Sequence, residues 1–189
     1  MDKDQLDALE KSPLGFAGKI KDKINGLLDE YRRERFSILL ETEKIVCAPS
    51  YQLPEYITPV ESSGNVGKSL YQAEGAMDAL EWDLALAITA LDNLHWWHRI
   101  IERHDFYING FINHYPDIMI RTESGKIILA ETKGAHLKND DSKQKLALGA
   151  AWAKAAGPQY RYFMVFKDED TPLEGAVTMS RFLEILKEL

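Results

Sequence analysis

The chain has 189 residues, of which 45% are hydrophobic and 28% charged, so its composition is that of a globular protein with a sizeable apolar core. The formal net charge of -7 argues against a protein that coats nucleic acid by bulk electrostatics, and the single cysteine, Cys47, excludes an internal disulfide and a zinc cluster of thiolates. No apolar run approaches the ~20 residues that a bilayer requires, so we expect a cytoplasmic protein without membrane contact.

The first third of the sequence predicts a helical extension followed by a connector. From Phe16 to about Leu40, apolar residues recur every three to four positions between charged ones, which is typical of a long amphipathic helix. Residues 48–68 are rich in proline and then in serine and glycine, which predicts an irregular connector. We therefore assign residues 1–68 to an N-terminal extension.

One run inside this connector resembles a nucleotide-binding loop. Residues 64–69 read Gly-Asn-Val-Gly-Lys-Ser, but the phosphate-binding pattern also needs a glycine at position 62, which is serine. The backbone cradle for phosphates therefore lacks its first hinge, and we expect no ATP site in this chain.

The rest of the chain, residues 69–189, predicts one α/β domain. Helical periodicity returns and ends near Asp92, and Ser180 is the expected N-cap of a closing helix. Short segments rich in aromatic or β-branched residues predict strands. The expected elements are a helix over 69–91, strands over 94–101, 115–121 and 126–133, a helix over 141–156, a strand over 160–166 and a helix over 181–189.

Three charged residues near the predicted hairpin are candidates for chemistry. Glu131 and Lys133 are two apart on one predicted strand, so their side chains lie on one face. A three-residue loop that ends at Gly125 in the left-handed conformation would place Asp117 opposite Glu131. A two-residue turn would instead pair Asp117 with Thr132 and move it to the other face.

Two carboxylates directly opposite each other repel, and a divalent cation would compensate them. Ligation by Asp117, Glu131 and the carbonyl oxygen of Thr132 suits Mg²⁺, for which Mn²⁺ is a substitute. Lys133 beside such a site could orient or help to deprotonate a water molecule and neutralise the phosphate in the transition state. The pattern therefore predicts metal-dependent hydrolysis of a phosphodiester.

These residues also carry a family resemblance. The pair Pro116-Asp117, the thirteen-residue gap and the triplet 131–133 look like the PD-(D/E)xK nuclease signature, and the predicted order α-β-β-β-α-β is that superfamily's core, a mixed sheet flanked by helices. More specifically, the chain resembles the C-terminal endonuclease domain of type III restriction enzyme Res subunits. That resemblance is carried by residues 96–134, 145–157 and 160–166.

The resemblance implies a Mg²⁺-dependent cut of double-stranded DNA, with Asp117 and Glu131 as metal ligands and Lys133 as the catalytic lysine. Such nucleases often add an acid from the helix before the first strand, for which Glu81 is the first choice and Glu74 the second. The implied partners are DNA, a helicase motor or modification subunit, and a second copy of the chain for cutting both strands. The family's motor is absent from these 189 residues, so translocation and target choice do not carry over.

Plainer interpretations compete with this one. The three charged residues could form a surface salt-bridge cluster, and Glu81 could lie on a solvated helix face. Lys143, Lys145 and His114 are weaker candidates for contacts to DNA. The alternative function is a nuclease-fold docking module that couples to a motor or specificity subunit without cutting, with residues 1–45 as its docking surface.

Overall fold

A computed structural model describes the chain in five stretches, residues 12–48, 50–64, 66–134, 139–170 and 172–189. The chain divides into two compact units, Met1–Val46 and Cys47–Leu189. The connector expected over 48–68 therefore lies in the same unit as the predicted α/β domain. Each unit is described by itself below.

The described part of the first unit is dominated by one helix, α2 (Pro13–Glu41), where the sequence predicts a helix over 16–40. Thr42 ends it, because both its backbone N–H and its hydroxyl group donate to the carbonyl oxygen of Ile38. Several large apolar side chains of α2 are about half exposed, among them Ile24, Leu27 and Tyr31. No helix in the described stretches is long and apolar enough to cross a membrane.

The second unit has the predicted α/β class and element order. Its elements are β1 (Ser62–Gly64), β2 (Glu74–Gly75), α3 (Ala79–Thr89), β3 (Leu94–Arg99), β4 (Ile108–Asn109), β5 (Asn113–His114), β6 (Ile118–Thr122), β7 (Ile127–Lys133), α4 (Asp140–Ala156), β8 (Tyr160–Phe166), β9 (Val177–Thr178) and α5 (Met179–Glu188). From α3 onward the long elements follow the predicted order α-β-β-β-α-β-α. The short pair β4–β5 is inserted between β3 and β6.

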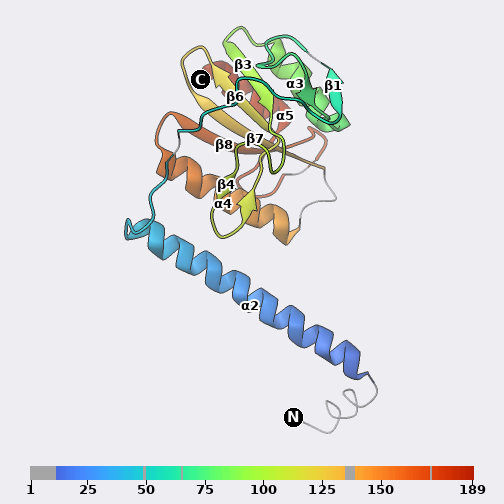
Figure 1. Cartoon of the computed structure of the whole chain (residues 1–189), viewed down its shortest axis with the longest axis vertical. Helices are drawn as coiled ribbons and strands as arrows, with labels where there is room; N and C mark the ends of the chain where they lie inside the picture. Colours follow the sequence, from blue (N-terminus) through green and yellow to red (C-terminus); the bar gives the residue numbers. More distant parts are fainter. Residues whose placement is uncertain (1–11, 49, 65, 135–138, 171) are drawn as a thin grey trace. The chain divides into compact units, whose positions relative to one another are not determined.

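A five-stranded mixed sheet lies at the centre, in the order β3-β6-β7-β8-β9 (Figure 1). β3, β6 and β7 are antiparallel neighbours, whereas β7 and β8 run parallel and are joined through α4. Such a parallel pair needs a crossover connection, which the helix supplies. The carboxyl ends of β7 and β8 therefore lie next to each other at the same end of the sheet.

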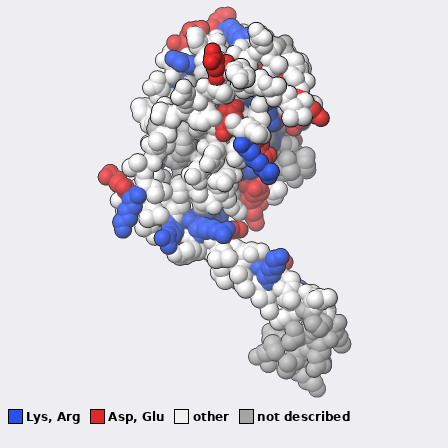
Figure 2. All heavy atoms as spheres, viewed as in Figure 1, with Lys and Arg blue, Asp and Glu red and all other residues white. Residues whose placement is uncertain are grey.

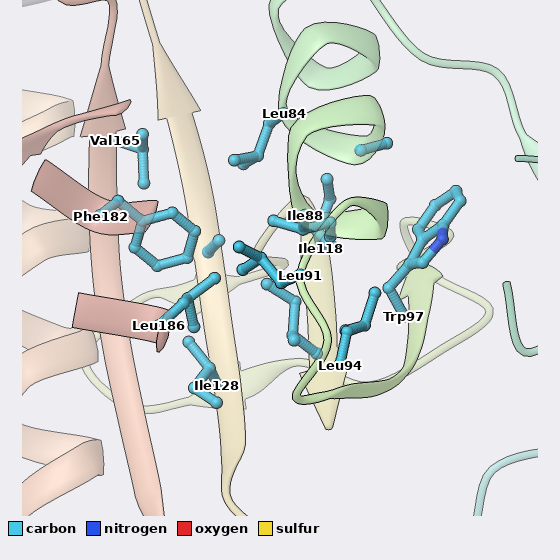
Figure 3. Close-up of a cluster of buried hydrophobic side chains, with 13 residues drawn as sticks. Leu84, Ile88, Leu91, Leu94, Trp97, Ile118, Ile128, Val165, Phe182 and Leu186 are labelled. Atoms are coloured by element: carbon cyan, nitrogen blue, oxygen red, sulfur yellow. The ribbon is translucent and has the colours of Figure 1, made fainter. Parts of the chain in front are cut away.

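The main core lies between one face of this sheet and the helices α3 and α5 (Figure 3). Ile128 and Ala130 of β7 point into it beside Leu84 of α3 and Phe182 of α5. Because side chains alternate along a strand, Leu129 and Glu131 belong to the opposite face, where α4 lies. A bulge in β3 between Leu94 and Trp96 shifts the alternation.

The predicted helix over 69–91 is wrong at its start, because α3 begins ten residues later, at Ala79. Asp78 is the N-cap, accepting hydrogen bonds from the backbone N–H groups of Leu80 and Glu81. The residues before it pair with the edge of the sheet: Leu70 donates to the carbonyl oxygen of Trp97 at 2.8 Å. This edge pairing outweighs the helical periodicity of the segment.

The expected N-cap of the last helix is also wrong. Thr178, not Ser180, caps α5. Both the backbone N–H and the hydroxyl group of Ser180 donate to the Asp168 carboxylate, at 2.7 and 2.6 Å. Ser180 is therefore engaged by a long-range partner that its local sequence does not reveal.

The turn between β6 and β7 has the three-residue form. Ile118 pairs with Ala130 and Arg121 with Ile127, and the next N–H along, that of Thr122, donates to the carbonyl oxygen of Lys126 at 3.0 Å. Gly125 has a φ of 85°, as this loop requires. Extending the pairing by one residue brings Asp117 level with Glu131, and the two-residue alternative is excluded.

Gly125→Val should lower the free energy of unfolding by roughly 1–2 kcal/mol or more, because a branched L residue resists positive φ. The new Cβ would also lie 3.4 Å from Nε2 of Gln159. Urea denaturation measures the effect. Gly67→Ala is the matched control, since its Cβ would meet no heavy atom within 4 Å, and equal stability of Gly125→Val and the parent would contradict the prediction.

Candidate active site

Two of the three predicted acidic residues, Glu81 and Asp117, line one cleft, whereas Glu131 is buried and is not part of its lining. Glu81 lies in the first turn of α3, Asp117 directly precedes β6 and Glu131 lies on β7. A cleft of about 420 Å³ opens at this end of the sheet, where the start of α3 meets the ends of β7 and β8. Its lining includes Glu81, Asp117, Thr132, Lys133, Gly134 and Lys167.

Asp117 is held at the cleft by the neighbouring strand. Its Oδ2 accepts hydrogen bonds from the backbone N–H and the hydroxyl group of Thr132, at 2.7 and 2.9 Å. Its Oδ1 lies 3.8 Å from Nη2 of Arg99. One carboxylate oxygen of Asp117 is thus fixed by β7, and the other is directed toward a cation.

Glu131 is nearly inaccessible, with 2% of its side chain exposed. Its Oε1 lies 2.6 Å from Nζ of Lys133 and 3.5 Å from Nζ of Lys145, whereas its Oε2 has no hydrogen-bond partner. Burial and the negative charge of Asp117 raise the pKa of Glu131 to about 7, even though the two lysines oppose the shift. The two carboxyl groups therefore interact electrostatically.

Glu81 has both a structural role and a place at the cleft. Its Oε2 accepts a hydrogen bond from the backbone N–H of Asp78 at 2.8 Å, completing a capping box. Its Oε1 accepts one from Nη2 of Arg99 at 2.7 Å. Burial and the charge of Asp117 raise the pKa of Glu81 to about 7.

The second-choice acid, Glu74, lies elsewhere. It is fully buried and accepts hydrogen bonds from Nδ1 of His98 at 2.8 Å and from the backbone N–H of Arg99 at 2.9 Å. Glu74 does not line the cleft, so of the two candidates the structure brings only Glu81 to Asp117.

The three weaker candidates for DNA contacts differ in their surroundings. His114 is buried, its Nε2 lies 2.8 Å from the Tyr162 hydroxyl group, and burial and the nearby lysines lower its pKa to about 3. Lys145 forms ion pairs with Glu131 and Asp141. Lys143 is exposed and pairs with Asp140 at 3.1 Å. Of the three, only Lys143 has a largely exposed side chain.

Two basic residues were not predicted from the sequence: Lys167, which lines the cleft, and Arg99, which contacts two of its acids. Lys167 follows β8. Because β8 is parallel to β7 and pairs Phe166 with Lys133, both lysines lie at the carboxyl ends of these two strands. Arg99, the last residue of β3, lies beside Glu81 and Asp117. The helix predicted between the strands over 126–133 and 160–166 was the signal available for Lys167, because such a crossover connects parallel strands, whereas nothing local indicated Arg99.

Charge on the visible surface is mixed. On the face seen in Figure 2, the acidic and basic side chains of the described residues are interspersed and form no continuous basic stripe there. At the cleft itself, the basic groups that could meet an anion are Lys133 and Lys167.

Whether the site fits a metal ion depends on its donor atoms. Within the described residues, no group of three or more His, Cys, Asp or Glu side chains is arranged to hold one. The donor chemistry nevertheless fits Mg²⁺, which prefers oxygen ligands: carboxylates of Glu81 and Asp117 line one cleft, and Oε2 of Glu131 is a buried oxygen without a hydrogen-bond partner, 3.9 Å from Nε2 of His114. Ion pairs to Arg99 and Lys133 occupy these carboxylates instead.

Comparison with known proteins adds nothing to this geometry. A scan against protein-family models and searches of curated proteins and of solved structures each found no match.

The buried Glu131 carboxyl group predicts a pH-dependent stability without metal. A carboxyl group whose pKa rises from 4.5 to about 7 on folding stabilises the fold below about pH 4.5, and this contribution is lost as the pH rises to about 7. Glu131→Gln cannot ionise. Measured by urea unfolding in EDTA, the stability of the parent relative to Glu131→Gln should fall by on the order of 1–3 kcal/mol across this range.

All other titrating groups are present in both proteins, so the difference between the two reports the ionisation of Glu131 together with its coupling to Asp117, Lys133 and Lys145. A difference that stays constant over this pH range would mean that Glu131 keeps its ordinary pKa in the folded protein.

Proposed function

We propose that the second unit is a Mg²⁺-dependent endodeoxyribonuclease domain of the PD-(D/E)xK type that hydrolyses phosphodiester bonds in double-stranded DNA. The observation that carries this proposal is the β6–β7 register, which brings Asp117 level with Glu131, beside Lys133. Glu81 of α3 adds a third carboxylate at the same end of the sheet. A surface salt-bridge cluster would not need a 2%-exposed carboxylate among them.

The fold supports the same proposal. The order α3-β3-β6-β7-α4-β8 matches the α-β-β-β-α-β core that the sequence resemblance implies, and its sheet is mixed, with helices on both faces. The resemblance to the cleavage domain of type III restriction enzymes makes such an enzyme's motor or modification subunit the expected partner.

Each residue at the site would have its own role in the proposed reaction. Bound Mg²⁺ would neutralise charge on the phosphate and lower the pKa of a water molecule. Asp117, Glu131 and Glu81 would hold the ion through carboxylate oxygens, and Thr132 through its carbonyl group. Lys133, 12% exposed and 2.6 Å from Glu131, can hold a proton at Nζ, orient the attacking water and neutralise the negative charge that develops on the phosphate.

Lys167 suits a role in substrate binding. It is exposed, lines the cleft, and follows the strand adjacent to the one that carries Lys133. An ammonium group in that position can contact a phosphate next to the one that is cut, and such contacts give affinity without sequence preference.

A second candidate function is docking without cutting. The half-exposed apolar side chains of α2 favour it, because they form a surface that another protein could cover. This function needs neither metal nor Lys133, and the following variants distinguish the two proposals.

Glu131→Ala should weaken Mn²⁺ binding by roughly tenfold or more, because it removes a ligand. Lys133→Ala should leave metal affinity unchanged or tighter, since it removes the cation that occupies Glu131, yet it should reduce cutting by ~10²-fold or more. Calorimetric titration with Mn²⁺ and a plasmid-cleavage assay in Mg²⁺ measure the two effects.

Glu184→Gln and Lys187→Ala on the exposed side of α5 are the controls and should behave like the parent. Metal binding by the parent that survives Glu131→Ala unchanged would remove the site as described. Absence of both metal binding and cutting in the parent would leave the docking function.

Lys167→Ala should weaken DNA binding about equally for unrelated sequences. It should also make the negative slope of log affinity against log salt less steep, by about one. Binding is measured by fluorescence anisotropy with Ca²⁺ in place of Mg²⁺ so that DNA stays intact, with Lys187→Ala as the matched control. An unchanged salt slope would exclude a phosphate contact by Lys167.

A further inference from the structure

The guanidinium group of Arg99 lies between two of the cleft carboxylates. Arg99 ends β3, the edge strand, and its side chain is 19% exposed. Its Nη2 donates to Oε1 of Glu81 at 2.7 Å and lies 3.8 Å from Oδ1 of Asp117. One nitrogen thus faces an acid from α3 and an acid that precedes β6.

The rest of the guanidinium group is fixed by the backbone. Nη1 donates to the carbonyl oxygens of Ile100 and Asp117, at 2.7 and 3.1 Å, and Nε is buried without a hydrogen-bond partner. The group is therefore aimed by main-chain atoms, and its Nη2 corner is the part directed at the acids. A surface arginine without such anchors would not keep this orientation.

The oxygens that Arg99 faces are the ones a metal ion would need. Oε2 of Glu81 is taken by the N–H of Asp78, and Oδ2 of Asp117 by the two donors of Thr132. Oε1 of Glu81 and Oδ1 of Asp117, the two that Nη2 of Arg99 faces, accept no main-chain hydrogen bond from the described residues and are the most open to a metal ion. Glu131 has its own cations, Lys133 and Lys145.

We propose that Arg99 is a built-in counter-ion that neutralises Glu81 and Asp117 in the metal-free protein and competes with the divalent cation for their free oxygens. This inference rests on the proposed function and concerns the regulation of that same site. Metal binding then requires the guanidinium group of Arg99 to turn away from these two oxygens, and because the group is planar and rigid, the backbone contacts of Nη1 must loosen as well. The competition lowers metal affinity and keeps the acids assembled until metal is present.

Removing Arg99 should therefore have two effects of opposite sign. Without metal, Arg99→Met leaves two poorly solvated carboxylates unpaired, and the melting temperature should fall. With metal, the ion no longer displaces a guanidinium group, so Mn²⁺ should bind roughly tenfold more tightly than it does to the parent. A purely structural arginine would give the first effect and leave metal affinity unchanged or weaker.

The experiment uses the full chain, with calorimetric Mn²⁺ titration and thermal melts in EDTA and in Mn²⁺. Arg99→Met is compared with the parent and with Arg181→Met, an exposed arginine that pairs with Glu184 on α5 and should change neither quantity. If Arg99→Met does not fold, Arg99→Lys takes its place. A lysine has no counterpart of Nη1, which main-chain carbonyl groups anchor, and should therefore yield more easily, giving Mn²⁺ affinity severalfold above the parent's.

The outcomes separate this inference from the proposed function. Tighter Mn²⁺ binding in the Arg99 variant supports it, including the case in which the parent binds too weakly to measure. If the parent binds Mn²⁺ through Glu131 and the Arg99 variant binds with equal or lower affinity, the counter-ion role is overturned and the nuclease proposal stands. If neither protein binds Mn²⁺, both fail together.

Discussion

The register between β6 and β7 is the constraint on which the rest of the site depends. It is set twice: by the turn that closes at Gly125, and by the core, because a one-residue slip would turn Ile118, Ile128 and their neighbours away from α3 and α5. Burying each such side chain is worth ~1.5–3 kcal/mol, whereas like charges facing each other cost ~0.2–1 kcal/mol. The apolar face therefore holds Asp117 and Glu131 together against their repulsion.

A second layer of polar contacts fixes the strand that carries Arg99. Buried Glu74 accepts hydrogen bonds from the imidazole of His98 and from the N–H of Arg99, and the other side of the imidazole meets Asp105. Burial alone would lower the pKa of His98, but its bonds to Asp105 and Glu74 raise it above its ordinary value. A charged imidazole between two carboxylates is fully paired, so the end of β3 is held firmly where Arg99 reaches the cleft.

Sequence reasoning succeeded where local signals agreed with the tertiary structure. The strand over 160–166 follows from β-propensity and matches the structure, and the three-residue loop before β7 was one of the two turns that the sequence left open. It failed where contacts between residues far apart in the sequence determine the local structure. Pairing with Trp97 prevented a helix before Asp78, and Arg99 meets Glu81 and Asp117 only because β3 lies next to β6. No spacing rule along the chain connects Arg99 with Glu81.

A net charge of -7 disfavours DNA binding, so the proposed function depends on the local charges around the candidate metal site. Glu81, Asp117 and Glu131 face Arg99, Lys133 and Lys145, so the carboxylates are already neutralised by side chains of the chain itself. An added Mg²⁺ would leave a local excess of positive charge. A phosphate attracted to this excess would in turn favour the metal-bound state, because linked binding equilibria are reciprocal. The face seen in Figure 2 carries no continuous basic stripe. Under the proposed function, this acidic protein would therefore bind DNA at the cleft when the cation is present and only weakly when it is absent.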